Sequence, residues 1–276
     1  MPHRKGADFW LAVLHLLVFA LLLQSFVEGE QEGHYLRYLV LQSWVLFVLI
    51  EMGHEAVHGA VHSSRRLNDA VGHVSCLLVG STFKVHRRQH LSHHTHPMQD
   101  RDIEHTVTPE LGDGLASFVV TSLTNVFAFS WMLRARSLRH RPEERRGLLV
   151  VLAGVFSLLI AFPVQTLLGW LAPLHIALAM FWFIAAWLPH GVLAICRSPR
   201  FPTLPHGLIQ LLTYYHEEHH LRPAYPFYQW PELYFARRRV MEALPLEQRA
   251  FVTRELRLMP IDQASAPPLS AAPQPA

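Results

Sequence analysis

The chain alternates between long apolar runs and short polar segments. The first two runs, residues 9–27 and 35–53, are each 19 residues long and are joined by an acidic loop. A helix of about 20 apolar residues is long enough to cross the hydrocarbon core of a bilayer. Two later runs, 147–169 and 173–190, predict a second hairpin whose short turn contains Pro173. The pattern therefore predicts an all-α membrane protein with four transmembrane helices arranged as two hairpins.

Two other apolar segments predict helices that lie in the membrane interface without crossing it. Residues 67–83 are interrupted by polar side chains, and residues 115–132 run into the Arg-rich stretch LRARSLRHRPEERR. If either segment crossed the membrane, the polar segment before it and the polar segment after it would lie on opposite faces. Residues 232–257 predict an amphipathic, Arg-rich helix. We treat residues 1–260 as one domain and the Pro/Ala-rich tail, residues 261–276, as disordered.

Composition and charge agree with a membrane protein. Hydrophobic residues make up 51% of the chain, and the mean hydropathy is +0.18. The net charge of +3 gives no indication of a nucleic-acid partner. Arginine and lysine, which mark cytoplasmic loops, flank both ends of the first hairpin. They predict that both ends of this hairpin, and the histidine-rich segments after it, face the cytoplasm.

Histidine is the compositional anomaly, with 20 residues in the chain. Box 1 is HEAVH (residues 54–58), box 2 is HLSHH (90–94) and box 3 is HEEHH (216–220). Residues three or four apart share a helix face, so the imidazoles of one box can reach a common point. Imidazole suits iron, zinc and copper, and eight imidazoles require two ions. The candidate ligands are His54, His58, His90, His93, His94, His216, His219 and His220, with His190 and then His206 as candidates for a ninth.

The order HxxxH, HxxHH, HxxHH at the ends of two membrane hairpins resembles the membrane fatty acid desaturase superfamily. The likeness covers residues 35–235 and includes HEAVHGAVHSSRRLND, HRRQHLSHHTHPMQDRD and YYHEEHHLRPAYPFYQWPELY, which are similar to bacterial members. The resemblance implies a non-haem di-iron enzyme of the bacterial inner membrane. Such an enzyme uses O2 and two external electrons to oxidise a C–H bond of a lipid chain. A ferredoxin or cytochrome would donate the electrons, the box histidines would bind two iron ions, and His190 stands where the family often adds a ligand.

Several polar residues around the boxes could orient the ligand imidazoles by hydrogen bonding. Each of them is also compatible with an ordinary place at the protein surface or the membrane interface. The candidates are His62, His86, His96, Glu55, Glu217 and Asp100.

The resemblance leaves the reaction open within the superfamily. The contexts SRRLND and QDRD around the first two boxes favour a fatty acid desaturase that acts on an acyl-lipid, acyl-CoA or acyl-carrier substrate. EEHHLRPAYP is also similar to carotenoid ketolases and hydroxylases, so one of these or another lipid hydroxylase is the alternative. The choice depends on where a substrate carbon lies relative to the metal.

Two functions from other classes also fit parts of the pattern. HEAVH and HEEHH both match HExxH, the zinc-protease signature, with Glu55 as general base and Asp113 available as a third ligand. This hypothesis leaves box 2 unexplained. A metal transporter would place its ligands near the middle of the spans. Here the boxes stand at helix ends, which favours an enzyme.

Overall fold

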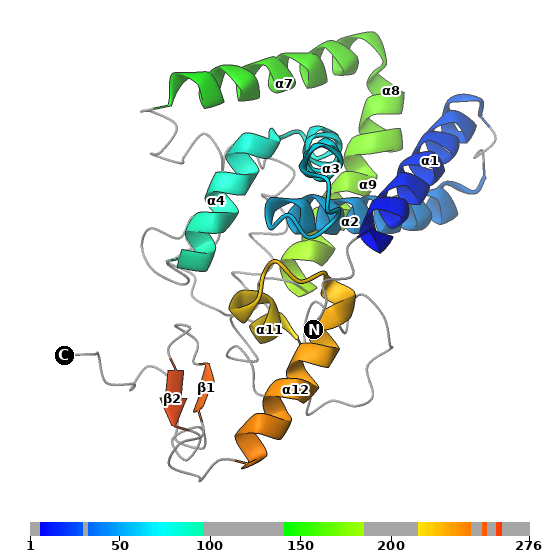
Figure 1. Cartoon of the computed structure of the whole chain (residues 1–276). Coiled ribbons are helices and arrows are strands. Elements are labelled where there is room, and N and C mark those ends of the chain that lie inside the picture. The colour runs from blue at the N-terminus through cyan, green and yellow to red at the C-terminus, as the bar shows by residue number, and fades with distance from the viewer. Residues whose placement is uncertain are drawn as a thin grey trace, which may run out of the picture.

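The fold is described from a computed structural model of the chain and is mostly helical (Figure 1). Within the part of the chain that the structure describes, three helices are long and apolar enough to cross a membrane: Ala7–Val27, Tyr35–Val57 and Pro163–Ile184. The residues that the structure describes are 6–29, 33–95, 141–184, 215–243, 250–252 and 258–260.

The first predicted hairpin is confirmed as helices α1 (Ala7–Val27) and α2 (Tyr35–Val57). Helix α2 is the central element, because it packs against α1, α3 (Arg65–Leu78) and α9 (Ala172–Phe181). Its apolar side chains form the middle of the core, where burial of apolar surface stabilises the fold. Fully buried examples are Leu46, Phe47, Leu49 and Met52.

The second predicted hairpin has its turn in a different place. Helix α7 (Pro142–Ala161) ends before Pro163, and the chain then continues as one helix from Pro163 to Ile184. That helix comprises α8 (Pro163–Thr166), the π-helical turn η4 (Leu167–Leu171) and α9, followed by residues 182–184. Proline disfavours a helical conformation in the residue before it but suits the first turn of a new helix. The predicted turn at Pro173 is therefore wrong, and the break occurs at Phe162.

The count of four spans stays a prediction. Helix α7 begins with the charged run Glu143–Arg146, and its apolar part, Gly147–Ala161, has only 15 residues. This is shorter than the roughly 20 residues that a spanning helix needs. The side of the membrane that the boxes face is likewise a prediction.

Pro173 lies inside a continuous helix because other groups replace the hydrogen bonds that it cannot make. Proline has no N–H to donate, so carbonyl groups in the preceding turn lose their helical partner. The Tyr38 hydroxyl donates to the Gly169 carbonyl oxygen at 2.6 Å, and the Tyr35 hydroxyl donates to Leu168 O at 3.1 Å. The start of α2 thus supports the π-helical turn.

We expect Tyr38→Phe to lower the free energy of unfolding by about 1–3 kcal/mol, because it leaves a buried carbonyl without a donor. Tyr35→Phe is the matched control. The hydrogen bond from the Tyr35 hydroxyl to Leu168 O is exposed, so we expect its loss to change the free energy of unfolding by no more than about 0.5 kcal/mol. Denaturant unfolding of the purified protein measures both values. Equal losses in the two variants would contradict this role of Tyr38.

The segment between boxes 1 and 2 forms α3 and α4 (Phe83–Thr95). Helix α3 has 14 residues, too few to cross a bilayer, and it is seen end-on in Figure 1 where α2 runs across the view. Both observations agree with the predicted interfacial helix. The second predicted interfacial segment, 115–132, lies outside the described residues, as do residues 185–214 and the whole tail, 261–276.

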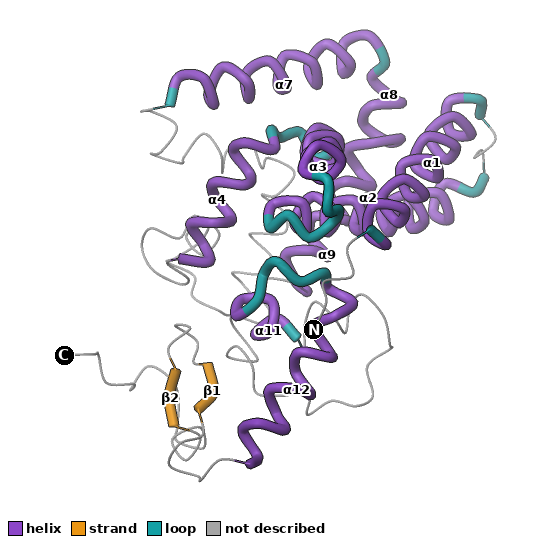
Figure 2. The backbone as a smooth tube through the Cα atoms, viewed as in Figure 1, coloured by secondary structure: helices purple, strands orange, loops and turns teal. Residues whose placement is uncertain are grey.

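The C-terminal part contains α11 (His216–Leu221), the short 3-10 helix η6 (Phe227–Gln229) and α12 (Trp230–Ala243). The helix predicted for 232–257 is confirmed as far as Ala243 and is wrong at 250–252, which form a strand. Residues 244–249 and 253–257 lie outside the described residues. Strands β1 (Ala250–Val252) and β2 (Leu258–Pro260) then pair antiparallel (Figure 2). This two-stranded ribbon was not predicted and departs from an all-α fold.

Candidate metal centre

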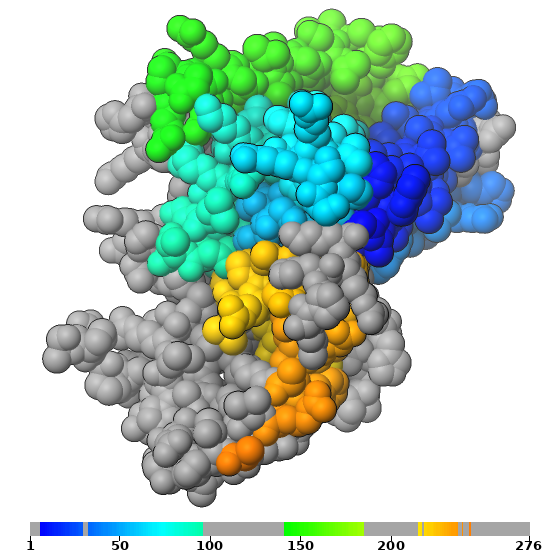
Figure 3. All heavy atoms as spheres, viewed as in Figure 1, coloured from blue at the N-terminus to red at the C-terminus, as the bar shows by residue number. Residues whose placement is uncertain are grey.

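Each box lies at the end of a helix, and the three ends meet. His54 is in the last turn of α2 and His58 caps it. Box 2 occupies the C-terminal half of α4, and box 3 forms most of α11. In Figure 3, α3 and α4 (cyan) lie between α7 (green) and α11 (yellow). Segments more than 100 residues apart in sequence therefore supply one site.

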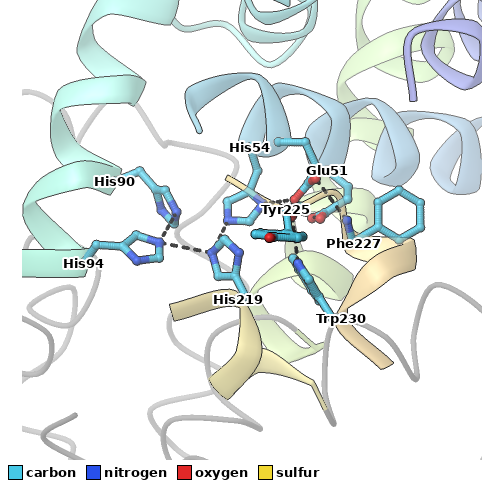
Figure 4. A network of polar contacts seen from close by, with 9 residues as sticks. Glu51, His54, His90, His94, His219, Tyr225, Phe227 and Trp230 are labelled. Atoms are coloured by element: carbon cyan, nitrogen blue, oxygen red, sulfur yellow. Dashed lines mark hydrogen bonds and ion pairs between the residues drawn. The ribbon is translucent and has the colours of Figure 1, made fainter. Parts of the chain in front are cut away.

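Five histidines from all three boxes form the first cluster, whose ligand atoms lie within 4.8 Å of one another. The Nε2 atoms of His54 and His219 are 3.1 Å apart, and those of His94 and His219 are 3.0 Å apart (Figure 4). Two nitrogens bound to one ion at about 2.1 Å, at right angles, would lie about 3 Å apart. One Nε2 cannot make full hydrogen bonds to two others, so a shared cation suits this arrangement better. The members of the cluster are His54, His58, His90, His94 and His219.

The other three box residues, His93, His216 and His220, form a second cluster. The Nε2 atoms of His216 and His220 are 2.9 Å apart. The two clusters are neighbours, because the rings of His94 and His220 have centroids 4.3 Å apart. The structure thus divides the eight predicted ligands into groups of five and three, as two adjacent ions would require.

The surroundings of four of these imidazoles favour the neutral form by lowering the pKa. Burial lowers the pKa of His58, His90 and His219 well below the usual value, and the charges of neighbouring histidines lower it further. The pKa of His94 is lowered in the same way, with burial as the largest cause. Neutral imidazole is the form that binds metal. His58 Nε2 is also buried without a hydrogen-bond partner among the described residues, as expected for an atom that would face a cation.

Two buried glutamates flank the cluster on the Nδ1 side of His54. Glu51 Oε1 lies 3.4 Å from His54 Nδ1, and Glu55 Oε1 lies 3.8 Å from it. Glu55 Oε2 also accepts a 3.1 Å hydrogen bond from the Phe227 backbone N–H. A carboxylate on the far nitrogen of a ligand imidazole fixes its orientation and raises its basicity. Glu55 lies beside His54 Nδ1 at a distance too long for a hydrogen bond, so its orienting role stays a prediction.

The position of Glu55 argues against a zinc protease. The general base of such an enzyme acts on a water bound to the metal, and therefore faces the metal. Glu55 instead faces His54 Nδ1 and Phe227, while the cluster uses Nε2 atoms. The five-histidine cluster also exceeds the two histidines and third ligand of that site.

The remaining predicted residues have varied surroundings. The His86 ring stacks on that of His90 with centroids 6.1 Å apart. Burial, with the charge of His54, lowers the pKa of His86 to about 4. His62 instead packs on Phe9 and accepts a hydrogen bond from the Ser64 N–H, outside both clusters. Four candidates, His96, Asp100, His190 and His206, and the side chain of Glu217 lie outside what the structure describes.

Aromatic side chains form one wall of the site, and of these Phe181 was not among the aromatic residues considered from the sequence. Trp230 is fully buried, and its ring centroid lies 4.8 Å from that of His219. Its indole N–H donates to Tyr225 O at 3.0 Å, which ties the segment after box 3 to α12. The ring centroid of Phe181, at the end of α9, lies 6.2 Å from that of His54. An interfacial aromatic belt predicts the same residue types, so no pattern in the sequence singles these two out.

Comparison with known proteins identifies related chains. A family model described as fatty acid desaturase matches residues 33–254. A beta-carotene ketolase from Paracoccus sp. (strain PC1) is 27% identical over 205 residues, which are 68% of this chain and 74% of the relative. A second one, from Paracoccus sp. (strain N81106 / MBIC 01143), is 28% identical over 206 residues with the same coverage. No solved structure matches significantly.

The family match includes all three boxes, and therefore every member of the two histidine clusters. It also covers α2, α3, α4 and the helix from Pro163, which carry or surround the clusters. The resemblance inferred from the box spacing is confirmed over most of the chain. This protein belongs to the fatty acid desaturase family.

Proposed function

We propose that the chain is a di-iron, O2-dependent membrane oxidoreductase that oxidises a carotenoid C–H position to a ketone. The observation that carries the metal chemistry is the division of eight buried or half-buried imidazoles into adjacent clusters of five and three. Two beta-carotene ketolases of similar sequence support the substrate class.

The donor set fits iron. It consists of imidazoles, which suit iron, zinc and copper, and membership of the fatty acid desaturase family supports iron among these. His54, His58, His90, His94 and His219 would hold one ion, and His93, His216 and His220 the other. Bound iron would supply the O2 activation and electron transfer. The protein contributes by lowering the pKa of His58, His90, His94 and His219 through burial, and by placing Glu51 and Glu55 beside His54 Nδ1.

The proposed reaction balances with an external reductant. Each oxygen insertion converts a C–H bond into C–O–H, and it consumes one O2, two electrons and two protons while releasing one water. A second insertion at the same carbon gives a geminal diol, which loses water to become the ketone. We propose that a separate ferredoxin or cytochrome supplies the electrons. A substrate dissolved in the bilayer agrees with a site at the end of a membrane-spanning helix.

Fatty acid desaturation is the second candidate. The family description and the SRRLND and QDRD contexts of boxes 1 and 2 favour it. Desaturation removes two hydrogens from neighbouring carbons and uses the same O2 and two electrons, but it releases two waters. Both reactions therefore need the same metal centre, and they differ in which hydrogens lie near it.

Expression in a bacterium engineered to make β-carotene tests both candidates. We expect a pigment that has lost two hydrogens and gained one oxygen at a ring carbon, detected by mass spectrometry of the extracted pigments. The His54→Ala variant is the matched control and should yield only β-carotene. A new double bond in the fatty acids, with unchanged pigments, would replace the ketolase proposal by the desaturase one. No change in pigments or lipids, with iron and a reductant supplied, would contradict both.

A further inference from the structure

A cavity of about 580 Å³ lies away from the histidine clusters, and the proposed reaction does not use it. Its walls come from the second half of α1, the end of α3, and the region where α7 turns into α8 and η4. In Figure 3 the spheres of α7 and α8 (green) lie along those of α1 (blue) at this edge of the molecule. The residues that carry the argument below are Leu77, Leu158, Gln165, Thr166 and Trp170.

The walls of this cavity present hydrocarbon. Of its ten lining residues, only Gln165, Thr166 and Trp170 carry a polar side-chain group. The Trp170 indole N–H donates to Leu78 O at 2.9 Å, and the Thr166 hydroxyl donates to Leu158 O at 3.0 Å. Both groups are therefore satisfied within the protein and leave an apolar surface. Water is disfavoured in such a cavity, because it needs two to four polar partners.

The cavity opens onto the lipid-facing surface of the protein. Two of its walls belong to candidate membrane spans, Ala7–Val27 and Pro163–Ile184. Large apolar side chains around it are exposed, with Leu77 at 52%, Phe162 at 56% and Val27 at 56%. In a membrane, the surface that these side chains form would contact lipid acyl chains. The cavity would then be continuous with the protein–lipid interface.

We propose that this cavity binds one acyl chain of a membrane phospholipid. An apolar cavity of about 150 Å³ holds benzene, so the volume here has room for roughly twenty carbon atoms, which is one acyl chain. Gln165 lines the cavity two residues after the helix break at Pro163, and its amide can hydrogen-bond the ester group of the lipid. This site is separate from the metal centre, because none of its lining residues belongs to either histidine cluster.

Retention of lipid by the purified protein tests the proposal. The protein is exchanged into detergent containing a brominated phosphatidylcholine, and native mass spectrometry counts the bound lipids. Leu77→Trp on α3 and Leu158→Trp on α7 place a large ring in the cavity. Their matched controls are Val74→Trp and Val150→Trp, because both positions are exposed on the same helices but do not line it. Iron content and helical signal report that each variant is folded.

We expect one tightly held lipid per chain in the parent and in both controls, and none in the two cavity variants. The bromine atoms of the bound lipid should quench Trp fluorescence in the parent. This quenching should be weaker in Trp170→Phe, which lacks the indole that lines the cavity. Equal lipid retention in all four variants would overturn the proposal. Absence of held lipid from the parent would also overturn it, and would indicate that another segment of the chain fills the cavity.

Discussion

His219→Ala is expected to abolish oxidation of the substrate and to remove at least one of the two proposed iron ions. His219 Nε2 lies 3.1 Å from that of His54 and 3.0 Å from that of His94, so its loss opens the middle of the five-histidine cluster. Changes to groups around a metal cost about 10–100-fold in affinity or activity, and loss of a ligand should exceed this. Iron content per chain, measured by elemental analysis, and product yield from the β-carotene-producing strain check the result.

His34→Ala is the control for this experiment. His34 is exposed at the start of α2, the same helix that carries His54, and it belongs to neither cluster. We expect unchanged iron and unchanged yield. Full iron content with full turnover in the His219 variant would contradict the ligand assignment. Loss of turnover with full iron would retain His219 in the site but give it another role.

Local spacing predicted which histidines cluster, because a cluster at a helix end depends on local geometry. Residues at i, i+3 and i+4 face one way in any helix, so each box could be recognised by itself. The grouping into five and three could not be read from spacing. His93 and His94 are adjacent in sequence, yet they belong to different clusters. His94 Nε2 lies 3.0 Å from His219 Nε2, whereas the His93 ring lies beside that of His220, with centroids 5.0 Å apart.

The errors in the fold have a similar origin. Both Pro163 and Pro173 could mark a turn, since proline interrupts the helical hydrogen bonds in either place. Only the folded chain shows that Tyr35 and Tyr38 donate to the carbonyls before Pro173, which lets the helix continue there. Trp230 was likewise indistinguishable from an interfacial aromatic until its ring was found against His219.

Glu55 connects two boxes that are far apart in sequence, which makes it the most informative residue outside the ligands. It is fully buried one residue after His54, and it accepts the Phe227 N–H from the segment that follows box 3. That segment leads directly to Trp230, which packs on His219. We therefore expect the carboxylate to influence the five-histidine cluster from two sides, through its place beside His54 and through the segment that leads to Trp230.

Glu55→Ala is expected to lower metal affinity by about 10–100-fold, because it removes the carboxylate beside His54. It should also reduce the free energy of unfolding by about 1–3 kcal/mol, because the buried Phe227 N–H loses its acceptor. Glu55→Gln keeps an acceptor oxygen but not the charge, so it should recover most of the stability and less of the affinity. Metal titration and denaturant unfolding separate the two effects. Glu143→Ala, at an exposed glutamate paired with Lys84, is the control and should change neither. Equal affinity in the Ala and Gln variants and the parent would show that Glu55 has no influence on the metal ligands.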